Sequence, residues 1–135
     1  MSHCDEYRVV YGDIVALYVF YWPLHQNLPK CAQLAMGDSI LLEMTASLRA
    51  VVSINQKCQG RQLCFDTHEL LVEVLRSMTA IKALLTQCRQ LMWITPGSLS
   101  VLTAHISKIL HCVTGWQMRL IEQAVIPLSE LPRLP

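Results

Sequence analysis

Charged side chains are scarce in this sequence. Asp, Glu, Lys and Arg make up 16% of the 135 residues and hydrophobic residues make up 53%, whereas a typical soluble domain has roughly 25% charged residues. A lone monomer of this composition would have to expose large apolar patches, which are rare on soluble monomers. We therefore expect part of the apolar surface to be covered by another copy of the chain.

Long apolar runs are also absent. A stretch of 16 residues without a charged residue, 14–29, includes Pro23, His25, Gln26 and Asn27. It is shorter and more polar than the run of about 20 apolar residues that crosses a bilayer. No basic, apolar and small-residue signal pattern opens the chain. The sequence therefore predicts a cytoplasmic protein.

The six cysteines form no C-x-x-C pair. Because no export signal is found, a chain of this length is not expected to be a disulfide-stapled domain. Cys88 falls on an apolar helical stripe, where a reduced thiol packs as a small hydrophobic side chain. We interpret the cysteines as reduced packing or surface thiols, with redox or metal chemistry as the alternative.

Catalytic and metal-binding signatures are missing as well. His105 and His111 are six residues apart, which does not match the i, i+4 spacing at which two histidines of one helix hold a metal. The sequence contains no nucleophile elbow, no phosphate-cradling glycine loop and no zinc-protease motif. We expect no metal, no cofactor and no enzymatic activity.

Apolar residues do recur at steps of three and four along four segments, which is the pattern of helices with one buried side. The segment 99–120 has the most regular stripe, with Thr95 placed to cap its start and Pro96 at the first helical position. The four stripes are Val10, Ile14, Leu17, Tyr21, Leu24 and Leu28; Leu34, Gly37, Leu41, Met44, Leu48 and Val51; Leu71, Val74, Met78, Ile81, Leu85, Cys88 and Met92; and Leu99, Leu102, Ile106, Ile109, Val113, Trp116 and Leu120.

These stripes predict an all-α, antiparallel up-down four-helix bundle over residues 1–126, followed by a proline-rich extended tail over 127–135. The helices are expected over about 6–28, 31–55, 66–92 and 99–120, with a loop over 56–65. A kink is expected between Val19 and Pro23, because a proline inside a helix bends it. Asp66 is expected to cap the third helix together with Glu69.

Two glycines leave two interpretations open. Gly37 lies on the buried stripe of the second helix. It is either a glycine that the helix tolerates or a point where another backbone comes close. Gly115 precedes Trp116; the pair could let a neighbouring subunit or partner approach and anchor it. Alternatively, Trp116 completes the core stripe of its helix, which its position on the stripe favours.

Basic and acidic residues are distributed unevenly. Residues 1–48 contain two basic and five acidic residues, whereas no acid occurs from Val74 to Leu120. A weak positive field is therefore expected over one half of the molecule. The candidates for nucleic-acid or polymerase contact are Arg49, Arg76, Lys82, Arg89, Lys108 and Arg119, and the alternative is ordinary solvated surface charge.

Several short motifs resemble one known family of four-helix bundles. Tyr21-Trp22-Pro23 is followed six residues after Pro23 by Pro29-Lys30, and a Leu-Leu pair at 70–71, the turn at 94–96 and Gly115-Trp116 follow in the family's order. The family includes the accessory variability determinant of diversity-generating retroelements and the bundle proteins encoded in ribosomal RNA intervening sequences. The likeness extends over about residues 7–119.

The resemblance implies a homopentameric barrel that has no catalytic site. It also implies that the protein binds a retroelement reverse transcriptase and its template RNA to support mutagenic cDNA synthesis. The net charge of +1 departs from the accessory members, which are strongly basic. The alternative function is an oligomeric protein-interaction bundle that does not bind nucleic acid.

Overall fold

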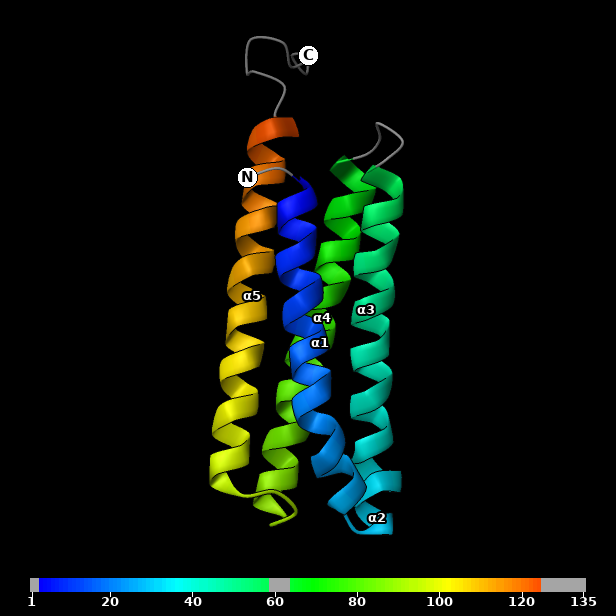
Figure 1. Ribbon diagram of the computed structural model, residues 1–135, viewed down its shortest axis with the longest axis vertical. Coiled ribbons are helices and arrows are strands. Elements are labelled where there is room, and N and C mark those ends of the chain that lie inside the picture. The colour runs from blue at the N-terminus through cyan, green and yellow to red at the C-terminus, as the bar shows by residue number, and fades with distance from the viewer. Residues whose placement is uncertain (1–2, 59–63, 125–135) are drawn as a thin grey trace, which may run out of the picture.

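The computed structural model describes residues 3–58 and 64–124, and no strand occurs within these ranges. Four long helical segments run alternately down and up the molecule (Figure 1). They are α1 (His3–Asn27), the segment formed by α2 (Lys30–Ala32), η1 (Gln33–Gly37) and α3 (Asp38–Cys58), then α4 (Cys64–Gln90) and α5 (Pro96–Ala124). The prediction of an all-α, up-down four-helix bundle is confirmed at this level.

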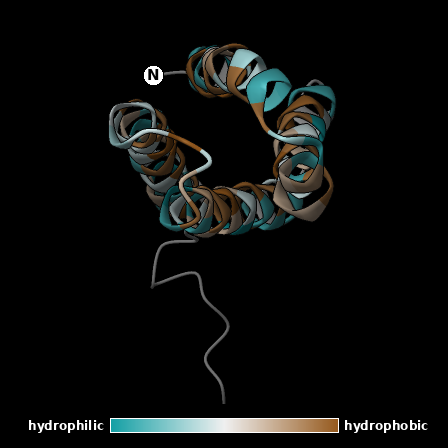
Figure 2. Cartoon of the chain, turned by 90° about the horizontal axis from the view of Figure 1, so that it is seen from below, coloured by the Kyte–Doolittle hydropathy of each residue, from teal (hydrophilic) through white to brown (hydrophobic). Residues whose placement is uncertain are grey.

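Each long helix packs against two neighbours: α1 against α3 and α5, and α4 against α3 and α5. An end-on view shows them arranged around one common axis (Figure 2). The expected stripes of α1, α4 and α5 supply most of the buried core, from Val10 in α1 to Leu120 in α5. Burial of each large side chain contributes on the order of 1.5–3 kcal/mol, so the shared core is the main source of stability for the bundle.

The helix boundaries differ from the sequence-based expectation by one to four residues, and α3 continues to Cys58 through the first residues of the loop expected over 56–65. α1 begins at His3 and α5 continues to Ala124. α4 begins at Cys64, so Asp66 lies inside its first turn and is not the residue before the helix. The cap predicted at Asp66 is therefore wrong, although an acid in a first turn still interacts favourably with the helix dipole. The tail expected over 127–135 lies outside the described residues.

The start of α5 is as expected. The Thr95 hydroxyl accepts a hydrogen bond from the backbone N–H of Ser98 at 3.1 Å, which satisfies one of the free donors at a helix start. Pro96 is the first helical residue. At the other end of this turn, Met92 has a φ of 63° and is 84% exposed, so its expected place in the core stripe of α4 is wrong.

The core stripe of the second helical segment is also partly wrong, and the reason is a π-helical turn at η1. The buried residues Ala32 and Gly37 are five apart, and α-helical spacing resumes at Ile40 and Met44. Leu34 within this turn is 68% exposed. An extra residue per turn rotates the preceding side chains around the helix axis, which moves Leu34 out of the core. Leu41 and Leu48 are half-buried and pack at the edge of the core.

Helix α1 continues through Pro23 as a single helix to Asn27, and the kink expected there stays a prediction. No helix in the described ranges is long and apolar enough to cross a membrane.

Candidate functional site

Two of the six candidate cations, Lys108 and Arg119 on α5, form ion pairs with carboxylates of α1. The Lys108 ammonium lies 3.1 Å from the Asp13 carboxylate, and the Arg119 Nε donates a hydrogen bond to the Glu6 carboxylate. Phe20, farther along the same side of α1, packs against His105 of α5. These contacts fix which side of each helix faces the other, and they neutralise both cations within the molecule.

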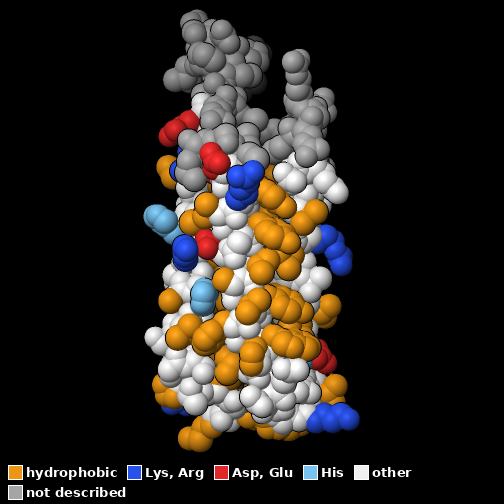
Figure 3. All heavy atoms as spheres, in the orientation of Figure 1, with side chains coloured by type: hydrophobic (Ala, Val, Ile, Leu, Met, Phe, Trp, Pro, Cys, Tyr) orange, Lys and Arg blue, Asp and Glu red, His pale blue; other side chains and the backbone are white. Residues whose placement is uncertain are grey.

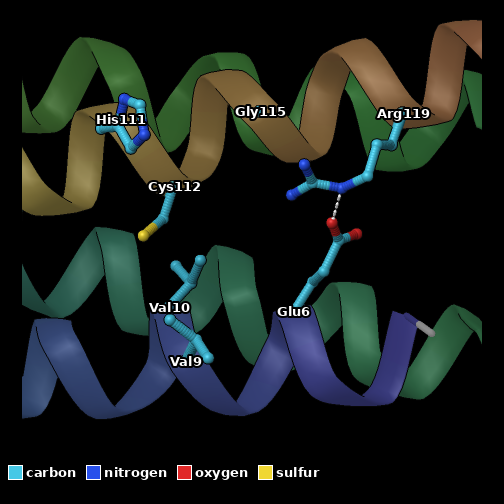
Figure 4. Close-up of a pocket in the computed structure, with 7 residues that line it drawn as sticks. All are labelled: Glu6, Val9, Val10, His111, Cys112, Gly115 and Arg119. Carbon is cyan, nitrogen blue, oxygen red and sulfur yellow. Dashed lines mark hydrogen bonds and ion pairs between the residues drawn. The ribbon is translucent and has the colours of Figure 1, made fainter. Parts of the chain in front are cut away.

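The Glu6–Arg119 pair is the more buried of the two pairs. The Glu6 side chain is 5% exposed, so it depends on its partner, because an unpaired carboxylate is costly to bury. Figure 4 shows the Arg119 side chain reaching from α5 toward Glu6 on α1. A Cβ on Gly115 would lie 3.2 Å from an Arg119 guanidinium nitrogen. Gly115 therefore leaves room for Arg119 of its own helix.

The structure answers the question about Gly115 and Trp116. Trp116 is fully buried, so it completes the core stripe of α5 and is not a surface anchor for a partner. The half-buried Gly115 is covered by Arg119. The interpretation of this pair as part of the core is confirmed for Trp116.

A pocket of about 200 Å³ lies between α1 and α5, beside this ion pair. Its floor is apolar, with Val9 and Val10 on one side and Cys112 and Gly115 on the other (Figure 4). Burial, followed by the nearby Asp13 carboxylate, raises the pKa of the Cys112 thiol. A raised pKa lowers the thiolate fraction at neutral pH, so this thiol is a poor nucleophile.

The four other candidate cations form no ion pair with any residue in the described ranges, but they do not share one surface. Arg49 on α3 and Arg76 and Lys82 on α4 are exposed, and Arg89 is half-buried near the end of α4. Arg76 and Lys82 are separated by about 120° around the helix, because each residue turns it by about 100°. The six candidate cations therefore lie on several sides of the bundle.

A polar cluster joins α1 to the π-helical turn at the lower end of the bundle. The Tyr21 hydroxyl is hydrogen-bonded to His25 Nδ1 at 3.2 Å, and His25 Nε2 lies 3.7 Å from the exposed Asp38 carboxylate. The Gln33 side chain donates to the His25 carbonyl at 2.8 Å. Burial, followed by the charges of Cys88 and Asp38, raises the pKa of Tyr21. The cluster locks the end of α1 onto η1 and α3.

An apolar surface follows the outer side of the α1–α3 pair. Trp22 stacks on His25, whose ring faces Gly37, so the row that leads to Trp22 lies on the α3 side of α1. On α3 the matching row begins at Leu41, one turn after Gly37. We define the α1–α3 face by Tyr11, Tyr18, Val19, Trp22, Leu41 and Val52, all of which are exposed or half-buried. Hydrophobic side chains gather over these two helices in Figure 3.

Sequence reasoning missed this face and the two acids that bind Lys108 and Arg119. Asp13 and Glu6 are seven residues apart and therefore on one side of α1, which was the available signal.

Within the described ranges, no three His, Cys, Asp or Glu side chains gather where they could hold a metal ion. Comparisons with protein families, characterised proteins and solved structures find no match to this chain.

Proposed function

We propose that this chain is a non-catalytic accessory subunit of a diversity-generating retroelement. It binds the reverse transcriptase and the template RNA of the element and supports mutagenic cDNA synthesis by positioning them. The four-helix architecture supports the proposal because it is the one that the motifs at 21–30 and 94–116 imply. Assembly as a cytoplasmic homopentameric barrel and the kink at Pro23 belong to the same proposal.

The main support for the proposal is that cations on α3 and α4 are exposed and form no ion pair with the described residues. Arg49 and Arg76 are exposed and have no acidic partner among the described residues, and the same holds for Lys82. A cation that is not already paired is available to a phosphate, and each such contact releases counterions. Lys108 and Arg119 are neutralised by α1, so they contribute less to binding than their neighbours on α3 and α4.

Purification of the tagged chain from its own host, followed by identification of the protein and RNA that co-purify, tests the proposal. Both the polymerase and the RNA are expected to co-purify. The double variant Arg49→Ala/Arg76→Ala is expected to weaken RNA binding and to lower the slope of log affinity against log salt by up to about two. Lys108→Ala is the matched control, because its ammonium is already paired with Asp13. Recovery of neither partner would refute the proposal.

The second candidate is an oligomeric protein-interaction bundle that does not bind nucleic acid. It is favoured by the ion pairs of Lys108 and Arg119 with α1 and by the spread of the remaining cations over several sides. Under this alternative the polymerase or another protein co-purifies after nuclease treatment, and direct titration shows no salt-dependent RNA binding. Loss of the RNA signal alone would select this candidate over the first.

A further inference from the structure

Sides with charged side chains alternate around the bundle with sides that have few charges. The α1–α5 side carries the two ion pairs, and the outward side chains of the α3–α4 pair include Arg49, Glu73 and Arg76. The α1–α3 face lies between these two charged sides and is built mainly of aromatic and aliphatic side chains, with the exposed Arg8 near the start of α1. The remaining side, over α4 and α5, is opposite the α1–α3 face, because α1 and α3 each neighbour one of these two helices.

The side over α4 and α5 is built mainly of small residues, with the large exposed side chains of Met118 and Ile121 toward the end of α5. Cys88 of α4 contacts Met36, so the side of α4 that carries Cys88 is turned toward the second helical segment. The residues of α4 that lie half a turn around the helix from Cys88 point outward beside α5. On α5, Lys108 and Arg119 face α1, and the opposite flank points outward beside α4. We define the α4–α5 face by the exposed residues Thr79, Ala83, Thr86, Ser107, Thr114 and Met118. No acid of the described ranges lies on it, and Lys82 is at its edge.

This small-residue face is also hollowed. Thr79 and Ala83 line a shallow depression on α4, together with Val72, Leu75 and Arg76. The α1–α3 face presents the opposite shape, because the large rings of Tyr11, Tyr18 and Trp22 project from it, with Tyr18 and Trp22 stacked at a centroid distance of 6.4 Å. A cation at the edge of one face and aromatic rings on the other attract each other.

From this shape and charge we infer that the α1–α3 face of one copy docks on the α4–α5 face of the next copy. The inference rests on the self-assembly in the proposed function and assigns the two surfaces that perform it. A two-helix face of 25-residue helices such as α1 is about 37 Å long and about 20 Å wide. Its area of about 700 Å² is close to the roughly 800 Å² per partner of a standard stable interface.

Because the two docking faces are different surfaces on opposite sides, the contact is heterologous and repeats from copy to copy until a ring closes. A contact of the α1–α3 face with itself would instead end at a dimer. Arg49, on the α3–α4 side, stays outside this contact and remains accessible to the polymerase and the RNA. Arg76 lines the depression on α4 and therefore lies where the assembly surface meets the α3–α4 side.

Light scattering after size-exclusion chromatography tests the assignment with one charged substitution on each face. Val19 is 65% exposed on the α1–α3 face, and Ala83 is exposed in the hollow of α4. Val19→Glu and Ala83→Glu are each expected to convert the wild-type oligomer to a monomer. Leu42→Glu is the matched control, because Leu42 is 70% exposed but lies about 100° around the helix from Leu41, on the side of α3 that carries Arg49 seven residues later. It is expected to leave the oligomer intact.

The decisive measurement is a mixture of the two variants. Val19→Glu retains an intact α4–α5 face and Ala83→Glu retains an intact α1–α3 face, so the mixture is expected to form a 1:1 dimer and no larger species. A dimer of Ala83→Glu by itself would overturn the heterologous contact. Wild-type mass in both single variants would overturn the face assignment, whereas a monomeric wild-type protein would refute the proposed self-assembly itself. Circular dichroism checks folding, and Tyr11→Glu and Thr86→Glu replace either variant that does not fold.

Discussion

Gly37 in the π-helical turn lies so close to the His25 ring of α1 that a Cβ at this position would be 2.7 Å from the Cε1 and Nδ1 atoms of the imidazole. The ring cannot easily move away, because it is hydrogen-bonded to Tyr21 and stacked on Trp22. The glycine is therefore a requirement of the contact between α1 and the second helical segment. This contact also holds the polar cluster together.

Replacing Gly37 by alanine is expected to destabilise the protein, although alanine is the better helix former. The added methyl group overpacks the contact with His25, at a cost of about 1–3 kcal/mol. Gly12→Ala is the matched control, because a Cβ at Gly12 meets nothing within 4 Å; it is expected to stabilise the helix by about 0.5–1 kcal/mol. Urea denaturation measures both changes. Equal stabilisation by the two substitutions would contradict the close contact.

The case of Gly37 shows where the sequence was informative and where it was not. Its place on the buried side of a helix followed from periodicity, but the contacting atoms belong to His25, which is a neighbour only in the folded molecule. The π-helical turn changes the spacing between Ala32 and Gly37 to five residues. A periodic pattern of three and four assumes a regular helix, so it placed Leu34 in the core.

The cations show the same limit for the candidate site. The sequence located every basic residue on its helix, and the eleven-residue spacing of Lys108 and Arg119 is that of two residues on one side of α5. It did not show that Asp13 and Glu6 bind them, because these acids are about a hundred residues away along the chain. Pairing across helices depends on which helices are neighbours and in which rotation, which single-helix periodicity does not contain.

Met92 ends α4 in a left-handed conformation with a φ of 63°. The backbone N–H of Trp93 donates to the Cys88 carbonyl at 2.9 Å, and that of Met92 donates to the Arg89 carbonyl at 3.0 Å, which is the Schellman pattern. Met92→Gly is expected to raise the free energy of unfolding by about 0.5–1 kcal/mol, because glycine adopts this conformation without strain. Thermal denaturation measures the change. Leu91→Gly, at the preceding position, is the control and is expected to destabilise.

The buried carboxylate of Glu6 is expected to make Arg119 the more important of the two α5 cations for stability. Arg119→Met leaves Glu6 without its ion-pair partner and is expected to cost about 1–3 kcal/mol. Lys108→Met is the control and is expected to cost at most about 1 kcal/mol, because the Lys108 side chain is 64% exposed.

A double-mutant cycle separates the ion pair from the packing of the arginine stem. Combining Arg119→Met with Glu6→Gln is expected to cost less than the sum of the two single changes, by about 1–2 kcal/mol. Chemical denaturation near neutral pH and low salt supplies the four stabilities. Additive single changes would show that Glu6 and Arg119 are not coupled.

The cysteines of the described core are expected to react with alkylating reagents in a fixed order. Cys31 is exposed, Cys112 is half-buried and Cys88 is buried, and burial raises the pKa of the Cys88 thiol. Alkylation by iodoacetamide at pH 8, followed by peptide mass mapping, is expected to modify Cys31 first and Cys112 more slowly. Cys88 is expected to react only after global unfolding. Early modification of Cys88 would contradict its burial on α4 against Met36 of the π-helical turn.

Tyr21 is expected to make the protein sensitive to alkali. Burial raises the pKa of its phenol above the ordinary value of 10.0, so the folded state retains a proton that the unfolded chain loses. The stabilisation is fully present below pH 10 and is lost as the pH rises beyond it. Urea denaturation between pH 8 and pH 11 is expected to show this decline. Tyr21→Phe, which has no ionisable group, is expected to flatten it, whereas Tyr11→Phe is the control at a 39% exposed tyrosine and is expected to leave it unchanged. An unaltered decline in Tyr21→Phe would place the alkaline transition in another group.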